Sequence, residues 1–325
     1  MKNLQANKSS QSMSGRKVGI VGVGAVGATA AYTLSMMGTC HEIVLFDIAS
    51  GIAKGKAIDI AQASYYAPQG TIVNAIDNLE DMKDCNIIVI TAGVPRKGDM
   101  TRADLLMINA KIIKDVTTTI KESSPDAIII CVSNPLDVMT YVISQITSWD
   151  RNRIVGMAGA LDGSRMAYQI QKKTGYSANQ TGSLVIGDHG EHMIPMPQNV
   201  SIGDIPLTQL VSQKDMEDII NRTKNGGAEI VKYLGTSGYY GPGRAIAHMV
   251  DAILNDTKTI VPSSVILDGE YGYKNISVGV PVVLGSKGVE SIIELDLDKK
   301  TQAKFKTSVE SIKESIEILK ENNFF

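Results

Sequence analysis

Four histidines are the chain's candidates for a general base that works near neutral pH, because imidazole is the side chain whose ordinary pKa lies in that range. His248 lies within an apolar helical stretch and is expected to be packed, whereas His41 precedes a strand and is expected at the surface. His189 and His192 lie in Gly-Asp-His-Gly-Glu-His, residues 187–192, where an apolar run ends. Glycines on both sides of His189 let a ligand approach it, so His189 is the predicted general base.

An imidazole that accepts a proton needs a carboxylate to fix its tautomer and to stabilise its protonated form. Asp162 is the predicted partner, because it lies in Leu-Asp-Gly-Ser-Arg, residues 161–165, just after the end of a predicted strand. Spacing along the chain also allows Asp188 or Glu191, which flank the histidine.

A glycine-rich segment follows the first predicted strand and opens an apolar helix. In such a Gly-x-Gly-x-x-Gly pattern the first glycine permits a tight turn, the second lets the backbone approach a pyrophosphate, and the third allows close packing of helix on strand. The N–H groups and the positive end of the helix dipole then face the phosphates. The residues of this predicted cradle are Gly22, Val23, Gly24, Ala25, Val26 and Gly27.

Asp47 lies twenty residues beyond Gly27, at the end of the next predicted strand. A carboxylate at this position accepts hydrogen bonds from both ribose hydroxyls of a dinucleotide. The residues after it, Ile48, Ala49 and Ser50, include no arginine for a 2′-phosphate. The predicted cofactor is therefore NAD rather than NADP.

Two arginines, Arg96 and Arg102, mark the ends of a glycine-containing loop that follows a buried strand. The loop leaves the carboxyl edge of the predicted sheet, where ligands of such sheets bind. A loop with a guanidinium at each end can close over an anion and exclude water. A solvated basic loop is the alternative.

The elements that position these residues alternate between short β-branched runs and helical patterns, as in a parallel sheet with crossover helices. Thr101 and Asp104 resemble a capping box at the start of one helix, with Arg102 in its first turn. The predicted strands of the first half cover residues 18–21, 42–46, 71–75, 86–90, 127–132 and 154–157. The expected fold is α/β, with a doubly wound parallel sheet, a Rossmann NAD-binding domain, over residues 17–159.

Beyond residue 160 the pattern changes to longer helices mixed with hairpin-like strands, which predicts a mixed α+β domain over 160–325. One helix is expected to be interrupted at Gly226-Gly227. Strands are expected at 261–269 and 278–284, and an amphipathic helix at 305–319 is expected to lie on the body of the protein. Residues 1–16 are expected to form a disordered tail.

The composition excludes several classes of protein. With 32 basic and 34 acidic residues, the formal charge of −2 provides no field for holding nucleic acid or an anionic membrane. Three scattered cysteines are too few for a disulfide framework or a thiolate metal site, so no metal is expected. Residues 18–40 are uncharged, but their five glycines make them too weakly apolar for an export signal or anchor. A cytoplasmic location is expected, with an organellar matrix as the alternative.

Five motifs in this order resemble those of the NAD-dependent lactate and malate dehydrogenases, over residues 17–319. Besides the glycine-rich segment they are Thr-Ala-Gly at 91–93, Ser-Asn-Pro-Leu-Asp at 133–137, residues 157–165 and Gly-Asp-His-Gly at 187–190. The resemblance implies that His189 accepts the proton, Asp162 supports it, and Arg165 clamps the carboxylate next to the reacting carbon. It further implies that Arg102 polarises the substrate oxygen.

The resemblance also implies contacts with the cofactor and with other copies of the chain. Asn134 would contact both the substrate and the nicotinamide side, and Asn109 would line the cofactor cleft. Further cofactor contacts are expected at Thr91, Ala92, Gly93 and Val132. A homodimer or homotetramer is expected.

The choice of substrate depends on Arg96, where lactate dehydrogenases usually carry glutamine and malate dehydrogenases arginine. A second guanidinium offers two donors to the second carboxylate of oxaloacetate. With pyruvate it would face a methyl group, and a desolvated charge without its partner costs roughly 3–5 kcal/mol. The resemblance therefore favours (S)-malate and oxaloacetate as the dicarboxylate substrate pair. The alternatives are an L-lactate or other 2-hydroxy-acid dehydrogenase and, more remotely, a non-catalytic NAD-binding sensor.

Three segments depart from the family pattern. Asp188 and Glu191-His192 replace the more usual small or differently charged neighbours of His189, which bears on its pKa. The loop reads Lys-Gly-Asp-Met at 97–100 where malate enzymes often have Lys-Pro-Gly-Met, which bears on its stiffness. The segment at 237–244 is richer in glycine than usual and ends in Arg244, which either tunes substrate choice or lies outside the cleft.

Overall fold

The computed structural model describes residues 15–95 and 100–325. Within these residues the largest sheet has nine strands in the order β13-β12-β11-β6-β5-β4-β1-β2-β3. Its six-stranded parallel part has the order of a doubly wound dinucleotide-binding sheet, which confirms the predicted fold class. The parallel strands are β1 (Lys17–Val21), β2 (Glu42–Phe46), β3 (Ile72–Ala75), β4 (Ile87–Ile90), β5 (Ile128–Cys131) and β6 (Ile154–Gly156).

These strands form where the sequence is apolar on both faces, because helices cover both sides of a parallel sheet. Every residue of β4 and β5 is buried. The predicted strand bounds differ from the observed ones by at most one residue at each end.

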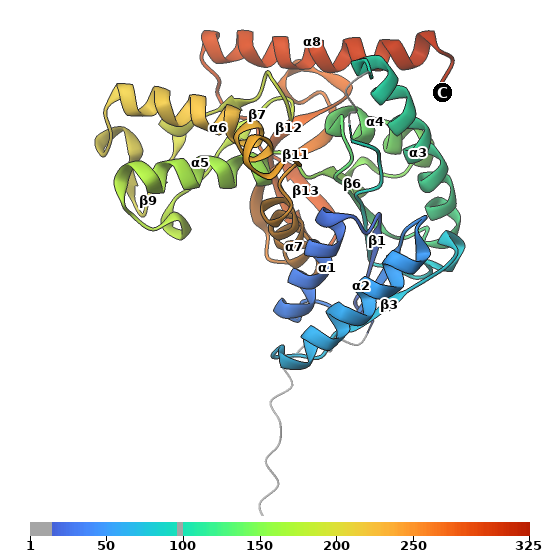
Figure 1. The fold of residues 1–325 in the computed structure, drawn as a ribbon. Coiled ribbons are helices and arrows are strands. Elements are labelled where there is room, and N and C mark those ends of the chain that lie inside the picture. The colour runs from blue at the N-terminus through green and yellow to red at the C-terminus, as the bar shows by residue number, and fades with distance from the viewer. Residues whose placement is uncertain (1–14, 96–99) are drawn as a thin grey trace, which may run out of the picture.

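Helices connect the parallel strands and cover the sheet (Figure 1). The helix that follows the β4 loop begins with the predicted capping box, in which Thr101 and Asp104 cap each other's backbone N–H. The helices of this half are α1 (Ala25–Met37), α2 (Ser50–Ala63), α3 (Arg102–Ser123) and α4 (Leu136–Thr147).

The second half extends the same sheet with antiparallel strands. Ser264 of β11 pairs with Gly156 of β6, which joins the two halves. The added strands are β11 (Thr259–Asp268), β12 (Lys274–Gly285) and β13 (Gly288–Ile292). Two short hairpins pair β7 (Val185–Ile186) with β8 (Ile194–Pro195), and β9 (Ser201–Ile202) with β10 (Ile205–Pro206).

Four helices complete this half: α5 (Gly159–Thr174), α6 (Gln213–Leu234), α7 (Tyr240–Leu254) and α8 (Lys299–Glu321). Helix α8 crosses one end of the molecule with its apolar side buried, as the sequence predicts (Figure 1). Short 3₁₀ helices lie at Ser64–Tyr66, Leu79–Asp81, Arg151–Arg153, Ala178–Gln180, Pro197–Asn199, Leu207–Gln209 and Glu270–Gly272. In the described residues, none of the helices combines the length and the apolarity needed to cross a bilayer.

Two predictions about the second half are wrong. Helix α6 continues through Gly226 and Gly227, because two glycines cost a helix only about 1 kcal/mol each relative to alanine and packing offsets this. His248 is exposed rather than packed. Its helix, α7, turns the neighbouring Ala247 and Met249 inward and leaves position 248 on the outer side.

Some predictions fall on residues 1–14 and 96–99, which lie outside the described residues. These are the disordered tail, apart from its last two residues, the position of Arg96, and the effect of Gly98-Asp99 on the loop.

Candidate active site

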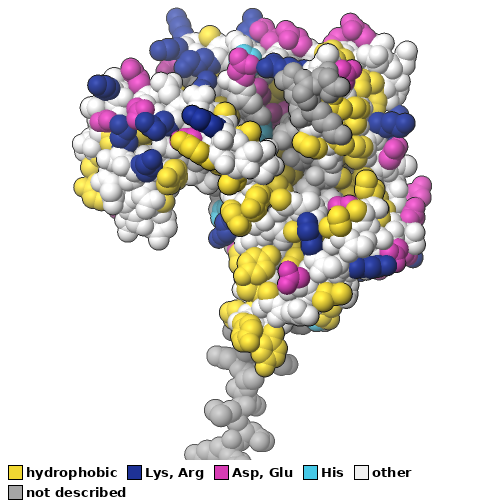
Figure 2. Space-filling model, in the orientation of Figure 1, with side chains coloured by type: hydrophobic (Ala, Val, Ile, Leu, Met, Phe, Trp, Pro, Cys, Tyr) yellow, Lys and Arg dark blue, Asp and Glu magenta, His cyan; other side chains and the backbone are white. Residues whose placement is uncertain are grey.

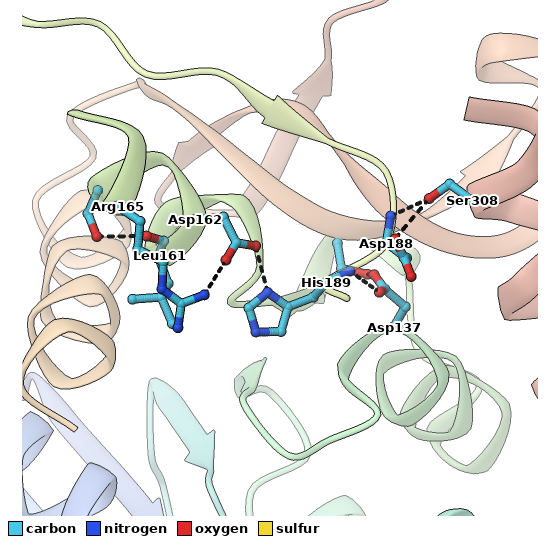
Figure 3. A network of polar contacts seen from close by, with 9 residues as sticks. Asp137, Leu161, Asp162, Arg165, Asp188, His189 and Ser308 are labelled. Carbon is cyan, nitrogen blue, oxygen red and sulfur yellow. Dashed lines mark hydrogen bonds and ion pairs between the residues drawn. The ribbon is translucent and has the colours of Figure 1, made fainter. Parts of the chain in front are cut away.

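His189 and Asp162 meet through their side chains, although they are far apart in sequence (Figure 3). His189 lies in the loop after β7, and Asp162 lies in the first turn of α5. The distance from His189 Nδ1 to Asp162 Oδ2 is 2.6 Å, and the carboxylate is almost fully buried. The alternatives contact other groups: Asp188 contacts Ser308, and Glu191 pairs with Arg102.

Asp162 also binds Arg165, one turn further along α5. Its second oxygen lies 2.8 Å from Arg165 Nη1, so one carboxylate is shared by an imidazole and a guanidinium. Arg165 Nε is buried and has no hydrogen-bond partner within residues 15–95 and 100–325. The guanidinium therefore keeps donor capacity for an anionic ligand.

The glycine pair in α6 lies against Arg165. A Cβ atom at Gly227 would lie 3.3 Å from Arg165 Nη2, whereas one at Gly226 would lie 3.5 Å from Arg165 Cδ. The first distance is tight and the second is an ordinary contact. The glycines thus leave space for the guanidinium within a continuous helix.

Gly227→Ala is expected to raise the KM for a carboxylate substrate severalfold, because the new methyl group displaces the guanidinium. It is also expected to stabilise α6 by up to about 1 kcal/mol through helix propensity. Steady-state kinetics and urea unfolding measure the two effects. Gly226→Ala is the matched control, with a similar gain in stability and an unchanged KM. Equal KM values for both variants would contradict the assignment of this space to Arg165.

The charges around His189 raise its pKa above the ordinary histidine value. Burial lowers the pKa of the imidazole, but Asp162 opposes this through its charge and its hydrogen bond. Asp137 also raises the pKa, and Arg165 lowers it. The surroundings thus favour the protonated imidazole relative to a free one.

Arg102, in the first turn of α3, is mostly exposed and lies 3.6 Å from Glu191. An exposed pair of this kind contributes little stability, so the guanidinium is easily released to another anion.

The predicted site residues line two cavities. Arg102 and His189 line one cavity of about 330 Å³. Arg165 lines a second cavity of about 340 Å³ together with Leu161, Gly238 and Pro242. Arg244 is exposed and is not among the described residues that line either cavity.

Asn109 and Asn134 link two loops at the carboxyl edge of the sheet. The Asn109 amide is buried, accepts from Val94 N at 2.9 Å and donates to the Asn134 carbonyl at 2.8 Å. Asn134 itself is exposed. The Asn109 side chain therefore holds the loops after β4 and β5 together, while Asn134 is exposed.

The glycine-rich segment fits a dinucleotide pyrophosphate. Gly22 has a φ of +93°, and a Cβ there would lie 2.7 Å from Ala92 N. A Cβ at Gly27 would lie 2.0 Å from the Gly22 carbonyl oxygen, so both glycines are required by packing. Gly24 is exposed, and a Cβ there would meet no described atom within 4 Å. Among the described residues no side chain caps the N-terminus of α1, so its N–H groups can donate to phosphate oxygens.

Asp47 holds the glycine-rich turn through its carboxylate. Its carboxylate accepts from Val23 N at 2.7 Å and from Ala49 N at 2.9 Å. Lys56 of α2 donates to the carbonyl of the same Val23 at 2.5 Å. Lys56 was not predicted from the sequence, because a lysine in a helix carries no signal of its partner.

The remaining predicted cofactor residues directly follow β4 and β5. Thr91 donates to the Gly22 carbonyl at 2.6 Å, and the backbone of Ala92 lies where a Cβ at Gly22 would be. Gly93 packs against Asn109. Val132 follows β5 and is partly buried. Among the described residues no group of His, Cys, Asp or Glu is arranged to hold a metal ion.

A doubly wound sheet with a glycine-rich turn, together with a buried carboxylate that joins an imidazole and a guanidinium, is typical of a dinucleotide-dependent oxidoreductase. Residues 16–156 match the NAD binding domain of lactate/malate dehydrogenase, and residues 159–323 match its alpha/beta C-terminal domain. The chain belongs to the lactate/malate dehydrogenase family.

Relatives in this family are similar over nearly the whole chain. Malate dehydrogenase from Sulfurimonas denitrificans is 49% identical over 312 residues, which cover 96% of this chain and 98% of that protein. The structure of malate dehydrogenase from Salinibacter ruber superposes with a TM-score of 0.90 at 40% identity, covering 94% and 98% of the two chains. Lactate dehydrogenase from Eimeria maxima with NADH and oxamate has a TM-score of 0.90 at 34% identity, covering 95% and 97%. The family, the oxidoreductase class and the cofactor NAD predicted from the sequence are confirmed.

Proposed function

We propose that the chain catalyses the reversible oxidation of (S)-malate to oxaloacetate with NAD. The observation that carries this proposal is the Asp162 carboxylate shared by His189 and Arg165, which holds a proton acceptor beside a carboxylate clamp. The sequence adds Arg96 for the second carboxylate of a dicarboxylic acid. The names of the relatives agree with this choice.

In the proposed reaction His189 takes the hydroxyl proton of malate. Its Nδ1 faces Asp162, so we assign the neutral imidazole a proton on Nδ1 and a free lone pair on Nε2. Asp162 then stabilises the imidazolium that forms. In the direction of oxaloacetate reduction, the same imidazolium returns the proton to the developing alkoxide.

The three arginines orient the substrate before the reaction. Arg165 binds the carboxylate next to C2, Arg96 binds the far carboxylate, and Arg102 polarises the C2 oxygen after leaving Glu191. Asn134 contacts the substrate and the nicotinamide side. When bound, NAD supplies the two-electron redox chemistry.

In this proposal residues 17–159 form the NAD-binding domain and residues 160–325 the substrate domain. The backbone of the glycine-rich turn holds the pyrophosphate, and Asp47 holds the adenosine ribose. The full set of proposed cofactor residues is Gly22, Val23, Gly24, Ala25, Val26, Gly27, Asp47, Thr91, Ala92, Gly93, Asn109, Val132 and Asn134.

The proposed assembly is a homodimer or homotetramer, and the proposed location is the cytoplasm. The support for an assembly, besides the family, is an apolar surface on α2 and the 3₁₀ turn that follows it. Hydrophobic side chains gather at this end of the molecule (Figure 2). Ile58 is 60% exposed, and Tyr65 and Tyr66 are more than 80% exposed.

A comparison of oxaloacetate and pyruvate, each with NADH and with NADPH, tests the proposed function. We expect kcat/KM for oxaloacetate to exceed that for pyruvate by about 100-fold or more, because an unpartnered guanidinium costs roughly 3–5 kcal/mol. We also expect NADH to be preferred to NADPH. Preference for pyruvate would instead indicate a lactate dehydrogenase. Binding of NADH without turnover of any 2-oxo acid would indicate a sensor.

A further inference from the structure

Asp137 is a buried carboxylate that the proposed reaction does not use. It lies in the first turn of α4 and is 4% exposed. Its Oδ2 accepts a hydrogen bond from the backbone N–H of His189 at 2.7 Å, and its Oδ1 accepts from Ser264 Oγ of β11 at 2.6 Å. Ser277 of β12 donates to the Asp137 carbonyl. The residue therefore joins α4, two strands and the His189 loop.

Asp137 and Asp162 contact different parts of His189. Asp162 contacts the ring of His189, whereas Asp137 contacts its backbone on the other side (Figure 3). His189 therefore lies between two buried carboxylates. An ionised carboxylate is costly to bury, and the two donors that Asp137 receives offset only part of that cost. A packed apolar residue would hold these elements together without this cost.

We propose that Asp137 is a second carboxylate partner of His189, a positioning residue that fixes the backbone of the proton acceptor and adds its negative charge to that of Asp162. The inference rests on the proposed function, in which His189 is the proton acceptor. Asp137 thus has two effects on His189. The hydrogen bond sets where the imidazole lies, and the negative charge stabilises the protonated imidazole.

The charged groups around His189 come from α3, α4, α5 and its own loop. On the opposite side of the ring from Asp137, Arg165 partly neutralises Asp162. The pKa of Asp137 is raised to about 6, because burial raises it by more than the hydrogen bonds from Ser264 and His189 lower it. The charged or titratable groups of the surroundings are Asp162 and Arg165 of α5, Asp137 of α4, Arg102 of α3, and Asp188, Glu191 and His192 of the loop.

Asp137→Asn separates the charge from the hydrogen bonds. The amide oxygen can accept from His189 N while the amide nitrogen donates to Ser264, so the backbone geometry is kept. We expect the pKa of His189 to fall, because a negative charge that favours the imidazolium is lost. Imidazole NMR titration of the protein without cofactor or substrate measures this shift, with the His189 signal assigned by its absence in His189→Asn.

The same variant shifts the pH profile. Malate oxidation needs neutral His189, so the acid limb of kcat/KM is expected to move to lower pH. The alkaline limb of oxaloacetate reduction, which needs protonated His189, is expected to move in the same direction. A catalytic group misplaced by 1 Å can lower the rate by about 100-fold. Because the hydrogen bond to His189 N is kept, kcat at the new pH optimum is expected to fall by much less than this. A role confined to fold stability would leave both limbs in place.

Ser277→Ala is the matched control, because it removes a hydrogen bond to the carbonyl of Asp137 and leaves its carboxylate intact. It is expected to leave the pKa of His189 unchanged.

Should Asp137→Asn not fold, Ser264→Ala tests the same effect of the Asp137 charge on the pKa of His189. Loss of that hydroxyl raises the pKa of Asp137, so the carboxylate is neutral over more of the imidazole titration and the pKa of His189 falls.

An unchanged pKa of His189 in the folded asparagine variant, or equal shifts in this variant and Ser277→Ala, would overturn the inference. The NMR titration needs no turnover, so its result is independent of the proposed function. Failure of the wild-type protein to oxidise malate would overturn the proposed function alone.

Discussion

His189→Asn is expected to lower kcat for malate oxidation by about 10²–10⁴-fold, the usual contribution of a general base. Asparagine can hydrogen-bond to Asp162 but cannot take a proton from the hydroxyl at neutral pH. NADH binding is expected to remain largely intact, because the histidine loop lies outside the glycine-rich turn. Steady-state kinetics measure the first effect, and titration of NADH fluorescence measures the second.

His192→Asn, in the same loop, is the control for general disturbance of this segment. It is expected to retain far more turnover than His189→Asn, because among the described residues His189 is the histidine bonded to Asp162. Substantial turnover by His189→Asn would remove His189 from its assigned role. A loss of NADH binding in parallel with turnover would point to a folding defect instead.

Arg96→Gln is expected to lower kcat/KM for oxaloacetate by about 100-fold or more relative to that for pyruvate. The change removes a charged partner of the second carboxylate, and it also removes the unpartnered charge that penalises pyruvate by roughly 3–5 kcal/mol. The measurement is the ratio of kcat/KM for the two substrates with NADH.

Arg102→Gln provides the matched comparison, because its proposed partner is the C2 oxygen that both substrates share. It is expected to lower activity with oxaloacetate and pyruvate alike and to change their ratio little. If Arg96→Gln leaves the ratio unchanged, Arg96 does not set the specificity and the preference for malate depends on other residues.

Features that depend on neighbouring residues were predictable from the sequence. The apolar runs of β4 and β5, the capping box of Thr101 and the glycine-rich turn each need only a short segment to specify them. The prediction of His189 as the proton acceptor also came from a short segment, because flanking glycines and the few histidines left little choice. This role stays a prediction, whereas its contact with Asp162 is present in the structure. Arg165 lies one turn from Asp162 on the same helix, so their contact follows from helical spacing.

Features that depend on packing between distant segments were not predictable in the same way. The prediction that Gly226-Gly227 interrupts a helix is wrong. The two glycines leave space for Arg165 of another helix, and no local sequence pattern shows that contact. Asp137 carried no separate signal, because the backbone N–H that it binds lies 52 residues away in sequence. Lys56 was missed for the same reason.

The sequence by itself determined where the strands and helices form, the glycine-rich turn and the residue types that are available for the proposed reaction. Tertiary structure alone decided that Asp162, rather than Asp188 or Glu191, contacts the His189 ring, and that a second buried carboxylate holds its backbone. The reason is physical: backbone propensity and turn geometry act over a few residues, whereas the distance between charged groups on different elements is set only when the core packs.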